Sequence, residues 1–241
     1  MKKTTIAVVS IGVYLAFAGI ARAQGPAPTK NIFLDVNFGV QANSQKLNIS
    51  TTPVIYGEIA FIDSSQEFKA SPLLDVTAGY RVWKDLSVAL GLTTTFNKST
   101  PATVSASIPS PVFFDRRVVT NATVTDLNHK ERSAQLLVMW SSPITDKIDG
   151  TVMAGPSFIK VFQGVPLTSV AAGSQTPTFS VDEKTATKTG LMFGGDVTFL
   201  LRPKTGIGVM ARYTAAKVEL AGVPDVRIGG FQLGGGLRLR F

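Results

Sequence analysis

Apolar and polar residues alternate with a period of two over many short stretches of this chain. The apolar row of the last stretch comprises Phe231, Leu233, Leu237, Leu239 and Phe241, and the intervening row comprises Gln232, Gly234, Gly236, Arg238 and Arg240. Successive side chains of a β-strand point to opposite faces of a sheet. This alternation therefore predicts a strand with one apolar and one polar face.

Seven further stretches alternate in the same way. The eight predicted strands cover residues 34–41, 74–82, 86–96, 134–140, 148–158, 190–201, 207–214 and 231–241. Turns near residues 84, 145 and 203 are short, whereas the other connections are longer and polar. Short turns on one side and long loops on the other are typical of outer-membrane barrels. The pattern predicts an all-β fold, an eight-stranded antiparallel up-and-down transmembrane β-barrel with short periplasmic turns and longer extracellular loops.

The polar face of the predicted strands is rich in Gly, Thr and charges of both signs. Its charged members are Asp35, Asp75, Arg81, Asp196, Arg212, Arg238 and Arg240. Small residues and mixed charges suit a narrow interior, whereas apolar rows with aromatic residues near both strand ends suit contact with lipid. An eight-stranded barrel leaves room inside only for side chains or one small ligand. We therefore predict a lumen that is largely plugged by an ion-pair network of these seven residues, and no open porin channel.

The first 23 residues have the three parts of a secretory signal peptide. Lys2 and Lys3 precede an apolar run over residues 6–20, and Ala21 and Ala23 provide a cleavage site. We predict a cleaved signal peptide at residues 1–23, a short linker at 24–30 and the barrel at 31–241. The excess of Lys and Arg is mild and spread along the sequence, so we expect no nucleic-acid partner.

The closing strand carries a resemblance to a known class of proteins. Residues 79–81, Gly-Tyr-Arg, and residues 234–241, Gly-Gly-Gly-Leu-Arg-Leu-Arg-Phe, resemble small bacterial outer-membrane barrels of the OmpA/OmpX type. The resemblance implies an integral protein of the Gram-negative outer membrane, exported through the periplasm and in contact with membrane lipid and lipopolysaccharide. It also implies recognition by the barrel-assembly machinery through Gly236, Leu237, Leu239 and Phe241. Gly234 departs from that signal, which usually has a polar residue there.

Candidate chemistry is sparse in this chain. His129 is the only histidine and cysteine is absent, so we predict no metal cluster and no cofactor. Lipid-modifying barrels that resemble lipid A deacylases use a His–Ser pair, but Ser133 would lie about 13 Å from His129 along a strand. We therefore expect no enzyme, and we interpret His129 as a histidine of a loop or of the barrel rim.

The second long loop contains an aromatic and basic patch formed by Phe113, Phe114, Arg116 and Arg117. This patch could contact lipopolysaccharide, or it could fold over the barrel mouth as a lid. Two functions remain open for the barrel as a whole, which we expect to be monomeric. The first is a structural or surface-interaction role with a plugged lumen. The alternative is a narrow transporter for small or hydrophobic molecules, resembling OmpW-type barrels.

Overall fold

The computed structural model describes residues 31–42, 46–68, 70–96, 98–220 and 223–241. The predicted signal peptide, residues 1–23, and the linker, residues 24–30, lie outside this part of the chain. The strands are β1 (Ile32–Ala42), β2 (Lys46–Thr51), β3 (Val54–Ile55), β4 (Glu58–Ile59), β5 (Phe61–Glu67), β6 (Ser71–Trp83), β7 (Leu86–Thr95), β8 (Lys98–Pro109), β9 (Arg117–Thr145), β10 (Ile148–Val170), β11 (Pro177–Arg202), β12 (Thr205–Leu220) and β13 (Val223–Arg240). Within the described residues, no helix has the length and apolarity needed to cross a membrane.

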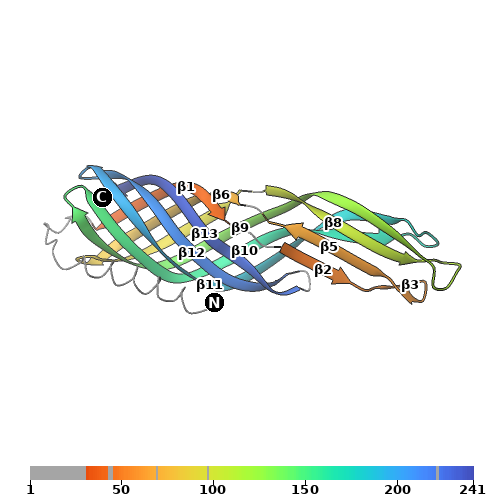
Figure 1. The fold of residues 1–241 in the computed structure, drawn as a ribbon. Coiled ribbons are helices and arrows are strands. Elements are labelled where there is room, and N and C mark those ends of the chain that lie inside the picture. The colour runs from red at the N-terminus through yellow and green to blue at the C-terminus, as the bar shows by residue number, and fades with distance from the viewer. Residues whose placement is uncertain (1–30, 43–45, 69, 97, 221–222) are drawn as a thin grey trace, which may run out of the picture.

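Eight strands pair in a closed antiparallel ring, in the order β1, β6, β7, β9, β10, β11, β12, β13 and back to β1. The β1–β13 ladder closes the ring, with Phe33 opposite Arg240 at one end and Ala42 opposite Phe231 at the other. Figure 1 shows this ring at one end of an elongated molecule. The predicted eight-stranded up-and-down barrel is therefore confirmed.

The connections at the two ends of the ring differ in length, as predicted. Two-residue turns join β6 to β7, β9 to β10 and β11 to β12. At the opposite end the long connections are β-hairpins, whereas the sequence predicts loops. Strand β9 alone is 29 residues long. Residues 132–140 of β9 pair with β7 inside the ring, and residues 117–129 pair with β8, so β8 continues along β9 beyond the end of β7.

These hairpins form a projection beyond the ring, visible in Figure 1 as the end that carries β2, β3, β5 and β8. The projection also includes residues 117–129 of β9, 164–170 of β10 and 177–190 of β11. Its interior is apolar, with a core of Ala60, Ala102, Val104, Ala106, Ile108, Val124 and Leu127. Phe179 of β11 packs against this core from the β10–β11 hairpin. The projection is therefore held together by its own hydrophobic core.

The apolar face of the strands changes sides between the ring and the projection. Along β12, Val209 and Tyr213 point outward, whereas Val218 and Leu220 are buried inside. The same change occurs in β10 and β13, and it creates a cluster that we call the cap cluster. Its members are Leu47, Phe68, Ile159, Val161, Ala216, Val218, Leu220, Val226 and Ile228. Apolar side chains face lipid in a membrane barrel and a core elsewhere, so the change marks the border between membrane and water.

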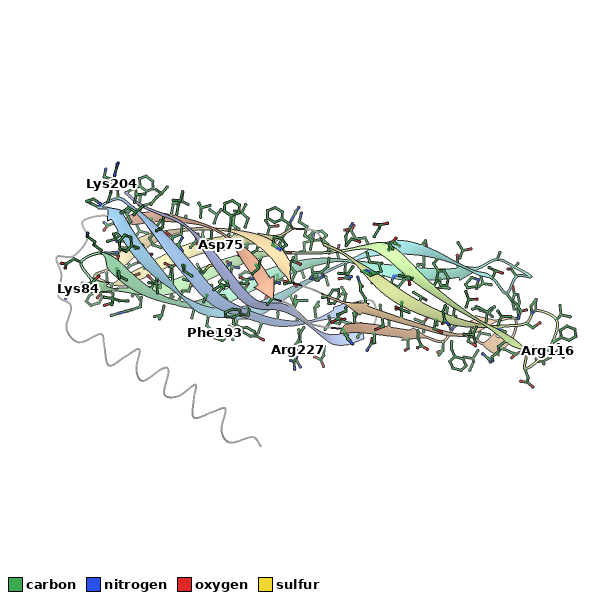
Figure 2. The ribbon with its side chains drawn as sticks, turned by 45° about the horizontal axis from the view of Figure 1, so that its top comes forward. Asp75, Lys84, Arg116, Phe193, Lys204 and Arg227 are labelled. Carbon is green, nitrogen blue, oxygen red and sulfur yellow. The ribbon has the colours of Figure 1, made fainter. Side chains whose placement is uncertain are left out.

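The outer wall of the ring is apolar and exposed, as the alternation predicts. Large exposed side chains include Phe38, Leu90, Leu92, Leu191, Phe193, Val209 and Leu237, and Figure 2 shows Phe193 on this outer wall. Tyr80, Trp140 and Phe199 lie on it near the short turns, and Phe96 and Phe158 lie on it toward the projection. The wall therefore has the aromatic girdles of a lipid-facing surface.

Candidate functional site

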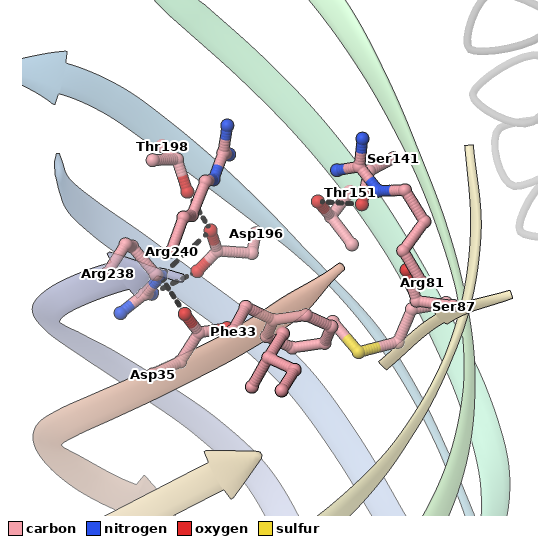
Figure 3. A pocket seen from close by; sticks show the side chains of 12 residues that line it. Phe33, Asp35, Arg81, Ser87, Ser141, Thr151, Asp196, Thr198, Arg238 and Arg240 are labelled. Atoms are coloured by element: carbon pink, nitrogen blue, oxygen red, sulfur yellow. Dashed lines mark hydrogen bonds and ion pairs between the residues drawn. The ribbon is translucent and has the colours of Figure 1, made fainter. Parts of the chain in front are cut away.

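The lumen near the short turns contains a cluster of ion pairs. Arg238 binds Asp196, and its Nε lies 3.9 Å from Oδ1 of Asp35. Nη2 of Arg240 lies 2.5 Å from Oδ2 of Asp149. Figure 3 shows Asp35, Asp196 and Arg238 joined in this way across β1, β11 and β13. Two of the predicted acids therefore share Arg238, whereas Arg240 pairs with Asp149, a partner that the sequence did not suggest.

A small polar cavity opens beside this cluster. Arg81 lines it across from Arg238, together with Ser87, Ser141 and Thr151 (Figure 3). Among the described residues, no carboxylate lies within ion-pair distance of the Arg81 guanidinium. The cavity has a volume of about 40 Å³, which is space for a few water molecules. Arg81 therefore faces the interior as predicted, but it faces the cavity instead of a carboxylate.

The middle of the lumen is crossed by Arg212 of β12. Its Nη2 donates to Oδ2 of Asp75 at 2.7 Å and to the Thr93 hydroxyl at 2.6 Å, and its Nε donates to Oε1 of Gln232 at 2.5 Å. The side chains of Arg212 and Asp75 have no exposed surface. Buried charges require a partner and further hydrogen bonds, and this cluster provides both.

Hydrogen bonds continue from this cluster toward the projection. Gln232 donates to Gln41 at 2.6 Å, and Gln41 donates to Glu131 at 2.8 Å. The other Glu131 oxygen lies 3.2 Å from Nε2 of His129, and Nδ1 of His129 lies 2.7 Å from Oε1 of Gln163. Together with the Arg212 cluster, these hydrogen bonds link side chains from seven of the eight strands of the ring, all except β11.

One side of the lumen is apolar, which differs from the predicted polar interior. Leu137, Met139, Met153 and Met192 form a buried cluster with Ala89, and Phe33 packs against it. These side chains come from β7, β9, β10 and β11. The filling of the lumen is therefore partly ionic and partly hydrophobic.

His129 is a buried side chain of β9 and does not lie in a loop. The ring of Phe68 lies 4.7 Å from its ring, between centroids. Ser133 accepts a hydrogen bond from Gln135 and is not a partner of His129. No His–Ser pair forms here, and no group of three or more metal-binding side chains occurs in the described part of the chain.

The sequence contained a signal for the residues that were missed. Along β9, every second side chain points into the lumen. His129 and Glu131 belong to the same inward-facing set as Gln135. The predicted strand began only at residue 134, because the Thr-rich segment before it reads as a loop. Extending the period-two pattern past that point would have placed both side chains in the lumen.

The aromatic and basic patch lies at the far tip of the projection, in the turn between β8 and β9. Figure 2 shows Arg116 at the end opposite to Lys84 and Lys204 of the short turns. The lid interpretation is therefore wrong, because this turn lies far from the barrel mouth. Phe114 is 81% exposed and Phe113 57%.

The two arginines of the patch have different surroundings. The guanidinium of Arg116 lies 5.1 Å above the Phe113 ring. Arg117 donates to the Ile59 carbonyl at 2.6 Å and lies 3.7 Å from Glu58. Arg117 therefore joins two hairpins of the tip, whereas Phe113, Phe114 and Arg116 are left accessible.

The C-terminal strand places its signal residues at the seam of the ring. Leu237 and Phe241 are exposed on the lipid side. Gly236 lies opposite Asn37, and a Cβ atom there would collide with the Val36 carbonyl oxygen. Glycine is therefore required for β1 and β13 to approach. Recognition of these residues by the assembly machinery stays a prediction.

A closed ring of eight antiparallel strands, with an apolar outer wall, aromatic girdles and charges inside, defines an integral β-barrel of the outer-membrane type. No family model matches the chain, and no curated protein matches it. Solved structures do match. The outer membrane protein OprG from Pseudomonas aeruginosa is 10% identical, with a TM-score of 0.50 over 88% of this chain and 96% of that one. This likeness concerns the fold.

Two further structures are similar over most of their length. Neisserial surface protein A is 17% identical, with a TM-score of 0.46 over 87% of this chain and 97% of that one. Ail of Yersinia pestis, solved in complex with the heparin analogue sucrose octasulfate, is 14% identical, with a TM-score of 0.40 over 87% and 99%. All three are small outer-membrane barrels.

Proposed function

We propose that this protein is a surface-interaction barrel, in which a non-conducting barrel anchors a rigid projection that contacts an external partner through its aromatic tip. The observation that carries the proposal is the combination of a filled lumen with a projection that has its own hydrophobic core. A channel needs space along its axis, whereas an anchor needs only a stable wall.

The lumen supports the anchor role. Ion pairs fill the end near the turns, Arg212 crosses the middle, and methionine side chains pack along one wall. A transport route for apolar molecules would need an open pocket between these groups and the projection. The cap cluster, with Ile159, Val161 and Val218, occupies that position with packed side chains.

The projection supports the contact role. Its tips are tied together, since the Tyr56 hydroxyl lies 2.9 Å from the carbonyl oxygen of Ala171 and 2.8 Å from that of Ser174 and donates its one proton between them. Arg117 of the β8–β9 hairpin adds a bond to Ile59 of the β3–β4 hairpin, which also carries Tyr56. A rigid surface loses little conformational freedom on binding, which favours affinity.

The accessible side chains of the tip indicate the kind of contact. Val112, Phe113 and Phe114 are exposed in consecutive positions, beside Arg116. Large exposed apolar side chains in a group are unusual on a surface that contacts only water. Aromatic residues and arginine are also enriched where proteins bind partners. The tip therefore suits a partner that offers an apolar pocket.

The experiment compares cells that lack the protein with cells that express the wild type, a tip variant or a control variant. The tip variant is F113S/F114S, and the control is L167S, which removes an exposed apolar side chain of β10 that is not part of the aromatic patch. Attachment to protein-coated surfaces and to cell monolayers is measured at equal surface expression. We expect attachment to fall to the level of non-expressing cells for the tip variant and to be unchanged for L167S.

Detergent sensitivity of the same cells separates contact from a purely structural role. If the tip variant attaches as well as the wild type, the contact proposal is wrong. If loss of the protein sensitises cells to detergent while attachment is unaffected, the role is structural support of the envelope. If the wild type conducts ions freely in a planar bilayer, the anchor proposal is wrong as well.

A further inference from the structure

Two cations lie side by side on the outer wall of the barrel, where the ring meets the projection. Arg132 of β9 and Lys160 of β10 are direct neighbours in the ladder, and both are exposed. Both charged groups contact one aromatic side chain, at 5.4 Å and 5.0 Å from the centroid of the Phe162 ring. Lys130 is opposite Phe162 in the same ladder, so a third cation belongs to this group.

These cations have no acidic partner. Among the described residues, no carboxylate lies within 4 Å of Arg132 or Lys160. Two other exposed lysines do have one, since Lys184 binds Asp182 at 2.7 Å and Lys217 lies 3.4 Å from Asp225. Glu131, the acid nearest in sequence, is buried in the lumen. The cluster therefore presents an uncompensated positive charge on the outside.

An apolar groove begins directly below the cations. It has a volume of about 560 Å³ and is lined by Leu74, Val76, Leu92, Ala134 and Phe158, with Arg132 and Lys160 at its upper end. The groove exists because Ala134 is small and lies between Leu92 and Phe158, its partners in the two adjacent ladders. An acyl chain is a suitable occupant for such a groove on a lipid-facing wall.

The three cations lie at the depth expected for the edge of the apolar membrane interior. On β9 the outward row runs from Trp140 through Leu136 to Arg132. Eight residues of a strand tilted by 35–45° span roughly 20 Å of depth, close to the ~25 Å apolar band of outer-membrane barrels. On β10, the apolar row changes from outward Phe158 to inward Ile159 at this same level. The cations thus lie where lipid headgroups begin.

We propose that Arg132, Lys160 and Lys130, with the groove below them, form a binding site for a phosphate-bearing lipid of the outer leaflet. The phosphate lies against the cations and one acyl chain lies in the groove between Leu92 and Phe158. Phe162 holds the two charges in place by cation–π contact. This site is independent of the tip contact proposed above, because it needs only the barrel wall.

The test measures binding of fluorescent bis-phosphorylated lipid A to the full-length protein in neutral detergent micelles. R132Q/K160Q removes two charges, and K217Q is the control, since it removes an exposed cation of β12 that already has an acidic neighbour. We expect affinity to fall roughly fivefold for each of the two cations and to change less than twofold for K217Q. Heat-modifiable gel migration verifies that each variant is folded.

Two further measurements distinguish a lipid site from a simple anion site. A134F fills the groove without changing charge, and we expect it to weaken lipid A binding at least fivefold. Dephosphorylated lipid A should bind the wild type no better than it binds R132Q/K160Q. The proposal is overturned if phosphate removal has no effect, or if K217Q weakens binding as much as R132Q/K160Q. It is also overturned if A134F binds as the wild type does, or if millimolar inorganic phosphate displaces the lipid completely.

Discussion

The ion pair between Arg212 and Asp75 offers a quantitative test of how the lumen is held together. In R212M, a methionine of similar length replaces the arginine and leaves the Asp75 carboxylate buried without its counter-charge. The hydrogen bonds from Arg212 to Thr93 and Gln232 are lost as well. Both charged side chains have no exposed surface in the wild type, so water cannot replace the missing partner.

The size of the effect follows from this burial. Removing one partner of a buried ion pair costs about 3–5 kcal/mol, because the remaining charge is uncompensated. Replacing both partners by apolar residues removes that penalty, so R212M/D75L should regain at least about 2 kcal/mol relative to R212M. An exposed pair behaves differently: K184M breaks the surface pair with Asp182 and should cost less than about 1 kcal/mol.

The assay is urea unfolding in phospholipid vesicles, followed by gel migration and tryptophan fluorescence. Trp140 lies exposed on the outer wall and Trp83 is exposed beside the β6–β7 turn, so the Trp140 emission reports loss of the lipid environment. We expect the order of stability to be wild type, then K184M, then R212M/D75L, with R212M least stable. A cost below 1 kcal/mol for R212M, or a double variant that is no more stable than R212M, would refute the reasoning.

Two other predictions concern closure and orientation. In G236A a Cβ atom would collide with the Val36 carbonyl, so the folded, heat-modifiable form should be largely lost. In G235A the added Cβ would only make ordinary contact with the Gly208 carbonyl, so this variant should fold normally. Equal folding of the two variants would contradict the seam geometry. The chain has no cysteine, so F114C and K204C each introduce one thiol, and a membrane-impermeant maleimide should label F114C on intact cells but K204C only after the outer membrane is opened. Labelling of K204C on intact cells would reverse the assigned orientation.

The barrel could be predicted from the sequence because lipid imposes one rule on every strand. Each outward position must be apolar and each inward position must fit a narrow lumen, so the closing strand alternates Leu237, Arg238, Leu239 and Arg240. The charges that this rule assigns to the interior do lie there. Their pairing could not be predicted, because it depends on the register between strands that are distant in sequence, such as Asp75 and Arg212.

The projection was not predicted for a different physical reason. Beyond the membrane border the apolar row turns inward and the outward row becomes polar, as in Ala102, Val104, Ala106 and Ile108 of β8. The period of two is preserved, but Ser, Thr and Pro between these residues give the segment the composition of a loop. The inward polar side chains His129 and Glu131 lie at this change of sides and were missed with it.

Conductance in a planar lipid bilayer tests most directly whether the barrel is a filled anchor. The purified full-length protein is inserted at increasing amounts, and current is recorded under an applied voltage on both sides of neutral. A lumen crossed by Arg212 and closed at the turn end by Arg238 and Asp196 predicts no current steps above the bare-bilayer background. Stable, reproducible steps in the nanosiemens range from the folded protein would contradict it.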